Sequence, residues 1–465
     1  MVKNKKELEK MLKIQLILSV TELYLRNIIL TFVLLCKEML LMSRLKKLLS
    51  DNGFAKAVIT LVSGSLIAQA MTIAVSPLLT RIFSPKELGV YTLILTAESL
   101  FGSIICGRYD VSIVSEPNEE KVYPIIKLSL IVTLIFSFLA ALGYGSFYFI
   151  FNEEYTGYSY AILFIFLMLV FNGLMRILES YNNRYKEYKL MTSVFVLKTS
   201  MQNLGSVVLG LLNFGVLGLL ISHTGGMLFG LKKQSTKLKN HMKLVFSSSR
   251  LEMKEVAMNH IRLPLYSAPA MFANRFSYAS IALGIEALYG LGVLGLYSIS
   301  YKALGLPLTV MSNNVAKVFY QEASREYDKT GKFIKSFRKT AMLLALIAIP
   351  MVLILYFLSP LVFEIVFGKE WRQAGIYVQF LAPMFGIRLI VNTVAYGLQV
   401  VKKQHLELIL QILFIVASFT CFIISKLLKF NVTQYLISIS ISFSVIYIVY
   451  FFTVMLNASG KLKNR

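Results

Sequence analysis

The amino-acid sequence predicts an all-α integral membrane protein of about twelve transmembrane helices. Of its 465 residues, 56% are hydrophobic and only 15% are charged, and the mean hydropathy is +0.67. This composition is too apolar for a surface in contact with water. Apolar runs of roughly 20 residues, the length that crosses a bilayer, recur along the chain. Because a spanning segment must satisfy its own backbone polar groups, we expect each run to be helical.

The apolar runs divide into two groups of six. The expected spans are 54–80, 88–114, 122–151, 158–180, 189–212, 213–231, 260–285, 292–318, 337–366, 374–400, 405–427 and 432–456. We therefore predict an N-terminal six-helix bundle over 42–231 and a C-terminal six-helix bundle over 260–465. Between them, 232–259 is rich in lysine and arginine and is predicted to be a basic cytoplasmic connector.

The basic residues predict the orientation of the chain. The formal net charge is +24, an excess that in a soluble protein would suggest a nucleic-acid partner. Here the lysines and arginines concentrate in alternate loops, which is typical of cytoplasmic loops beside anionic lipid head groups. We therefore expect both termini in the cytoplasm, contacts with anionic membrane lipids and no nucleic-acid partner.

The first 41 residues fit this pattern poorly, because their apolar stretch is interrupted by Glu22, Arg26 and Lys37. Met42 begins a short basic segment directly before the first expected span. We hypothesise a natural start at Met42, which would make 1–41 an upstream N-terminal extension; the alternative is that its apolar stretch forms an interfacial helix.

Short repeats indicate an internal duplication. Leu-Gly-Val-Tyr at 88–91 recurs as Leu-Gly-Leu-Tyr at 294–297, and 151–155 resembles 367–371. Six spans per copy is an even number, so the two copies share one orientation and are related by an axis along the membrane normal. Two such halves can rock around a midplane cavity, which favours a transporter without a catalytic step.

Charged side chains inside the expected spans are the candidate functional residues, because a charge at a helix centre costs roughly 2.5–3.5 kcal/mol. The basic candidates are Arg108, Arg176, Lys198, Arg275, Lys302 and Arg388, and the acidic candidates are Glu98, Asp110 and Glu179. The basic excess favours an anionic ligand such as a diphosphate. The acids are candidates for ion coupling, with His223 as a further titrating group.

A structural alternative exists for several of these residues. Arg108, Arg176 and Lys198 lie near span ends and can reach the cytoplasmic interface, and the acids can simply pair with the arginines. Asn172 and Arg176 share one face of the fourth span, and Arg388 and Asn392 share one face of the tenth span in swapped order. This symmetry suggests that both pairs face the cavity from equivalent helices of the duplication. The rival explanation is that the match is a coincidence.

Two prolines mark the start of the seventh span. Pro264 and Pro269 remove backbone donors and are hinge candidates, although a kink held by packing is an equally good interpretation.

Other motifs carry no chemistry. The GxGxxG at 290–295 follows no strand, no P-loop occurs, and neither the cysteines nor the histidines have metal-ligand spacing. We therefore expect no cofactor, no metal and no enzymatic activity.

Four stretches carry a family resemblance, namely 79–91, 107–114, 295–298 with 318–324, and 367–375. In them the chain resembles the bacterial O-antigen and polysaccharide flippases of the multidrug/oligosaccharidyl-lipid/polysaccharide exporter superfamily. The resemblance implies a multidrug-exporter-like fold that moves an undecaprenyl-diphosphate-linked oligosaccharide across the cytoplasmic membrane. It also implies polysaccharide polymerase or assembly proteins as partners.

Two other functions compete with this interpretation. A cation-coupled multidrug exporter of the same architecture would need a cavity rich in carboxylates and aromatic rings, and the basic excess argues against it. A membrane-embedded polysaccharide polymerase or ligase would need a large external loop, whereas all expected external loops are short.

Overall fold

The structure, a computed structural model, describes residues 53–150, 152–308, 312–401 and 403–460, and every regular element within these ranges is a helix. The helices of the first half are α2 (Gly53–Ile82), α3 (Pro85–Gly102), α4 (Tyr109–Ser115), α5 (Glu119–Phe149), α6 (Ala161–Arg184), α7 (Tyr188–Leu211), α8 (Gly215–Gln234), α9 (Met242–Ser247) and α10 (Arg250–Asn259). Those of the second half are α11 (Ala268–Pro307), α12 (Asn313–Thr330), α13 (Ile334–Phe367), α14 (Arg372–Val394), α15 (Gly397–Val400), α16 (Gln404–Leu427) and α17 (Val432–Ala458).

Within the described ranges, ten helical segments are long and apolar enough to cross a membrane. One of them, Leu263–Gly305, has 43 residues, about twice the length that a bilayer requires. It is broken at Gly290, whose φ of 78° and ψ of 179° are not helical, so it covers two of the expected spans. Helix α3 adds a further apolar helix that carries Lys86, Glu87 and Glu98. The predicted all-α membrane fold of about twelve spans is confirmed.

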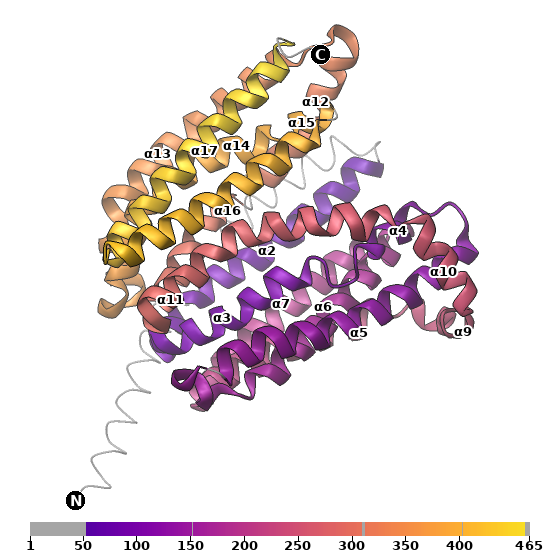
Figure 1. The fold of residues 1–465 in the computed structure, drawn as a ribbon, viewed down its shortest axis with the longest axis horizontal. Coiled ribbons are helices and arrows are strands. Elements are labelled where there is room, and N and C mark those ends of the chain that lie inside the picture. Colours follow the sequence, from indigo (N-terminus) through magenta and orange to yellow (C-terminus); the bar gives the residue numbers. More distant parts are fainter. Residues whose placement is uncertain (1–52, 151, 309–311, 402, 461–465) are drawn as a thin grey trace, which may run out of the picture.

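The helices gather into two groups that meet along α3 and α11 (Figure 1). We call α2–α8 the N-terminal bundle, in which α7 packs against α2 and α8, and α6 packs against α4, α5 and α8. We call α11–α17 the C-terminal bundle, in which α14 packs against α13 and α17, and α16 against α11 and α17. Helix α11 crosses α3 and α13 touches α2, so the bundles are joined through a few helices.

The crossing of α3 and α11 is reciprocal. A Cβ atom added to Gly89 would lie 1.9 Å from the Leu291 carbonyl oxygen, and one added to Gly295 would lie 1.8 Å from the Pro85 carbonyl oxygen. Gly89 and Gly295 are related by an offset of 206 residues, and so are Pro85 and Leu291. The glycines of the repeated Leu-Gly-X-Tyr motif therefore let the two related helices approach backbone to backbone.

Further contacts join the bundles at this same end of the molecule, which we call the crossing end. The Trp371 indole donates a hydrogen bond of 2.9 Å from Nε1 to the Thr80 carbonyl oxygen, and Trp371 is fully buried. The Thr80 hydroxyl in turn lies 3.4 Å from the Phe367 carbonyl oxygen. The α2–α3 junction is thus tied to the α13–α14 junction.

The opposite end, which we call the basic end, carries α9, α10, α12 and α15 (Figure 1). The predicted connector 232–259 folds here as the end of α8 followed by α9 and α10. It packs on the start of α5, where Lys121 pairs with Glu255 at 2.8 Å and Lys127 donates to the carbonyl oxygens of Phe246 and Ser248.

Two expected spans differ from the observed helices. The span expected over 88–114 is interrupted, because Gly107 and Arg108 both have positive φ angles (59° and 65°) and separate α3 from α4. Two successive left-handed residues cannot continue a right-handed helix. The span expected over 292–318 also ends early, since α11 ends at Pro307 and α12 is amphipathic, with Phe319 and Ala323 buried among charged neighbours.

The start of the C-terminal bundle explains the two prolines. Residues Leu263–Ser267 form one π-helical turn, in which the Ala268 N–H donates to the Leu263 carbonyl. Pro264 lies in the first positions of this turn and Pro269 in the first turn of α11, where the missing donors are tolerated.

The expected extension 1–41 and the start at Met42 lie outside the described residues.

Candidate functional site

Several predicted charges of the N-terminal bundle form one connected network. Asn172 on α6 donates to the Glu98 carboxylate at 2.9 Å and accepts a hydrogen bond of 3.1 Å from Arg176 Nε. Arg176 also lies 3.9 Å from the Asp110 carboxylate, whose residue is only 6% exposed. The network thus joins α3, α4 and α6, and the Asn172 amide bridges Glu98 and Arg176.

His223 extends this network to α8. Its Nε2 lies 3.0 Å from the second Glu98 oxygen, and its Nδ1 is 2.9 Å from the Tyr91 hydroxyl. The charge of Lys198 on α7 acts on Glu98, and together with that of Arg176 it also acts on Glu179. Glu98, Asp110 and Glu179 are therefore all in the field of basic side chains.

Arg388 on α14 lies in an aromatic setting of the C-terminal bundle. Its guanidinium carbon is 4.1 Å from the centre of the Tyr278 ring and 5.2 Å from that of Phe385. One of its terminal nitrogens donates to the Tyr301 hydroxyl at 3.4 Å, and the Tyr278 hydroxyl is 3.0 Å from that of Tyr447. Flat guanidinium groups stack well on such rings, which keeps Arg388 in place without a carboxylate.

Arg275 on α11 connects the two bundles electrostatically. The positive charges of Arg176 in the N-terminal bundle and of Arg388 in the C-terminal bundle both act on it. We call Arg176, Arg275 and Arg388 the arginine cluster. The Arg275 side chain is exposed, so it is accessible to a ligand.

The arginine cluster has an excess of positive charge. Among the described residues, neither Arg275 nor Arg388 forms an ion pair with a carboxylate, and the Arg388 Nε is buried without a hydrogen-bond partner. Like charges repel, and more strongly where the surroundings exclude water. An anion between the arginines would relieve this repulsion and supply acceptors.

Other predicted residues make contacts outside the arginine cluster or none that the structure describes. Arg108 donates from Nε to the Ser267 hydroxyl at 3.3 Å, which links the α3–α4 break to the π-helical turn. Lys302 has neither an ion pair nor a hydrogen bond in the described part of the chain. The proposed symmetry of Asn172 and Arg176 with Arg388 and Asn392 is also incomplete, because Arg388 turns to the tyrosines and Asn392 bonds to none of the described residues.

The tyrosines of this site are not among the residues that the sequence indicates, because they carry no charge. Tyr278 is three residues after Arg275, a spacing that places both side chains on one helix face. Tyr301 directly precedes Lys302. Helical spacing could therefore have indicated Tyr278, whereas the approach of Arg388 from another helix depends on tertiary packing.

Comparison with known proteins identifies the family. Residues 78–375, well over half of the chain, match the model of a family described as "Polysaccharide biosynthesis protein". No curated protein matches significantly.

Solved structures share the fold at low identity. An inward-facing MATE family multidrug resistance transporter of the MOP superfamily superposes with a TM-score of 0.66 at 13% identity, over 85% of this chain and 96% of that one. The lipid II flippase MurJ, in an inward closed conformation, gives 0.65 at 15% identity, over 85% and 89%. A MOP superfamily transporter from Pyrococcus furiosus gives 0.60 at 14% identity, over 88% and 97%. The chain is thus a multi-pass membrane protein with the fold of MOP superfamily transporters, and it belongs to the polysaccharide biosynthesis protein family.

Proposed function

We propose that this protein is a flippase that moves an undecaprenyl-diphosphate-linked oligosaccharide repeat unit across the bacterial cytoplasmic membrane by alternating access. The product would serve the synthesis of O-antigen, capsule or exopolysaccharide. The observation that carries the proposal is the arginine cluster, in which Arg275 and Arg388 have no carboxylate partner among the described residues. A diphosphate supplies several anionic oxygens, and guanidinium groups bind such oxygens with paired, charge-assisted hydrogen bonds.

The arrangement of the bundles suits this task. The bundles α2–α8 and α11–α17 meet at the crossing end through α3 and α11, and the arginine cluster contains members of both. A diphosphate held by Arg176 on one bundle and Arg388 on the other would respond to any change in their separation. The π-helical turn with Pro264 and Pro269 is the proposed hinge, because its backbone is already partly free of helical hydrogen bonds.

The orientation follows the charges. The basic connector 232–259 and α12 lie at the basic end, so we assign this end and both termini to the cytoplasm. Their lysines and arginines would contact anionic lipids there. Cargo would enter from this side, and polymerase or assembly proteins would act on the product released at the crossing end.

The acidic network is the proposed coupling site. Glu98 is held by Asn172, His223 and the charge of Lys198, and Asp110 and Glu179 lie near Arg176. Protonation or sodium binding at these carboxylates would release basic side chains toward the arginine cluster. Such a link would connect an ion gradient to diphosphate affinity.

Reconstitution tests the proposal directly. Purified protein in liposomes is given a fluorescent, short-chain polyprenyl-diphosphate sugar, and its movement between leaflets is measured with and without proton or sodium gradients. Removing one charge-assisted contact costs about 1.5–3 kcal/mol, so R275M and R388M should slow translocation about 10- to 100-fold. The matched control is R372M, because Arg372 pairs with Glu364 at 3.3 Å outside the cluster. Wild-type rates in both cluster variants would contradict the proposed binding site.

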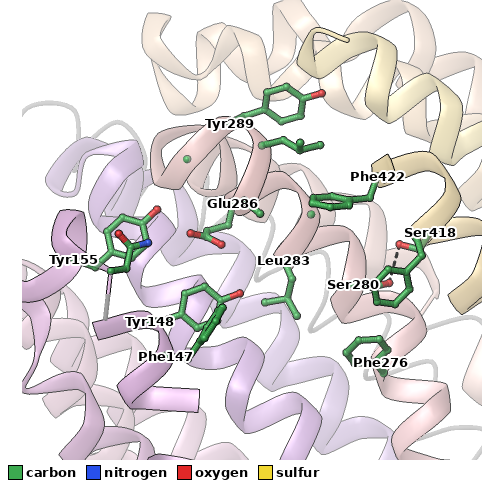
Figure 2. Close-up of a pocket in the computed structure, with 16 residues that line it drawn as sticks. Phe147, Tyr148, Tyr155, Phe276, Ser280, Leu283, Glu286, Tyr289, Ser418 and Phe422 are labelled. Atoms are coloured by element: carbon green, nitrogen blue, oxygen red, sulfur yellow. Dashed lines mark hydrogen bonds between the residues drawn. The ribbon is translucent and has the colours of Figure 1, made fainter. Parts of the chain in front are cut away.

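A cation-coupled multidrug exporter of the same architecture is the alternative function. One observation favours it, namely a cavity lined by aromatic rings and Glu286 (Figure 2). None of the three arginines lines this cavity, however, and they would repel an organic cation. Gradient-driven export of organic cations from the same liposomes, without movement of the lipid-linked sugar, would favour the alternative.

A further inference from the structure

The cavity of Figure 2 lies on the flank of the junction between the bundles. Its volume is about 880 Å³, and its walls come from the end of α5, the 3-10 turn Glu153–Tyr158, α11 and α16. Aromatic rings line it on both sides, contributed by Phe147, Tyr148, Phe276, Tyr289, Phe419 and Phe422. Several of them are in mutual contact, and Phe276 stacks on Phe419 at 6.1 Å between ring centres.

One carboxyl group points into this aromatic cavity. Glu286 on α11 is 6% exposed and is the only charged residue among the described residues that line the cavity. Figure 2 shows its carboxyl group directed from α11 toward Tyr148 and Tyr155 of the N-terminal bundle. Its negative charge acts on the Tyr148 hydroxyl. The cavity therefore combines one fixed acidic group with several π-faces.

This lining selects the chemistry of a ligand. Aromatic faces and a carboxylate both attract a cation, whereas Glu286 would repel an anion. Magnesium and calcium ions need six or more oxygen ligands and are usually held by carboxylates, whereas Glu286 is the one carboxylate among the described lining residues. A substituted ammonium group attached to an apolar body satisfies both the acidic and the aromatic parts.

The mouth of the cavity indicates where such a ligand comes from. Phe147 on α5 and Phe419 on α16 are 65% and 48% exposed, and both belong to helices that are apolar enough to cross the membrane. The Tyr289 side of the cavity lies near the crossing end, because Tyr289 donates to the Phe430 and Asn431 carbonyl oxygens in the α16–α17 turn. The cavity thus opens toward lipid in the half of the bilayer at the crossing end.

From these observations we infer that the cavity binds the ammonium head group of a membrane phospholipid, with Glu286 as its counter-ion. The acyl chains extend past Phe147 and Phe419 into the bilayer. None of the three cluster arginines lines this site, and the site does not depend on the identity of the transported cargo.

Lipid retention tests this site. The full chain is reconstituted in nanodiscs that contain equal amounts of phosphatidylethanolamine and phosphatidylglycerol, and the lipids that stay bound are counted by native mass spectrometry. We expect wild type to retain phosphatidylethanolamine preferentially and E286Q to retain about tenfold less. The control is E364Q, since Glu364 pairs with Arg372 and does not line the cavity. Equal phosphatidylethanolamine retention by wild type and E286Q would overturn the inference.

A second arm distinguishes a lipid from a free cation. In nanodiscs of phosphatidylglycerol alone, tetrabutylammonium binding is measured by equilibrium dialysis. If binding requires Glu286 while wild type shows no preference for phosphatidylethanolamine, the ligand is a free organic cation and the lipid assignment is wrong.

A ring deletion keeps the test decisive if E286Q does not give monodisperse protein. F422L removes one π-face while retaining an apolar side chain on α16. We expect it to reduce phosphatidylethanolamine retention several-fold, and retention equal to wild type would contradict the inferred site.

Discussion

The reciprocal crossing of α3 and α11 gives the sharpest structural prediction. In G295A, the new Cβ atom would lie 1.8 Å from the Pro85 carbonyl oxygen and 3.0 Å from the Gly89 nitrogen. Ordinary contact begins at 3.4 Å, so the two backbones must separate by about 1.6 Å. Overpacking of this kind costs typically 1–3 kcal/mol, which is a roughly 5- to 150-fold change in a conformational ratio. Because the crossing joins the bundles, G295A should favour conformations that are open at the crossing end.

Distances between spin labels measure this effect. Labels are placed at Asn213 in the α7–α8 turn and at Lys429 in the α16–α17 turn, both of which are exposed, in a cysteine-free background. Pulsed electron resonance in nanodiscs should show a longer distance population in G295A than in the parent. G292A is the matched control, because a Cβ atom at Gly292 on the same helix meets no atom within 4 Å. An unchanged distance distribution in monodisperse G295A would refute the role assigned to the crossing.

Three further predictions concern single contacts. W371F removes the hydrogen bond to the Thr80 carbonyl and should lower the free energy of unfolding by about 1 kcal/mol. The effect is measured as a lower Tm in detergent. An unchanged Tm would mean that the bond contributes nothing. Burial acts to raise the pKa of Glu326 on α12, but hydrogen bonds from the Ser336 hydroxyl and N–H outweigh it, so its pKa lies below the ordinary value of 4.5. Its contribution to stability is therefore present above pH 4.5 and is lost as the pH falls through the lowered folded-state pKa. E326Q should accordingly lower Tm at neutral pH and flatten its acid dependence, and parallel Tm profiles for both proteins would contradict this. S84A removes the capping box of α3 and should cost roughly 1 kcal/mol, again read as a fall in Tm relative to a distant serine control, S438A.

The candidate site was only partly predictable. Arg176, Arg275 and Arg388 could be identified because charge inside an apolar run is costly and therefore rare. The sequence gives no information on which of these charges lie near one another, because the three arginines are on three different helices that are far apart along the chain. The sequence does not indicate Glu286, because the expected span 260–285 ends one residue before it and places the acid in a loop.

The fold class followed from the sequence because the bilayer imposes a simple rule, that a segment without water must be long, apolar and helical. The repeated Leu-Gly-X-Tyr motif also indicated the duplication before any contact was known. The tertiary structure alone decided that its two glycines lie at one helix crossing, that Gly107 and Arg108 separate α3 from α4, and that the charges of Arg176 and Arg388 both act on Arg275. Local hydrophobicity sets which segments enter the membrane, whereas close approach and charge clustering depend on side chains from different helices.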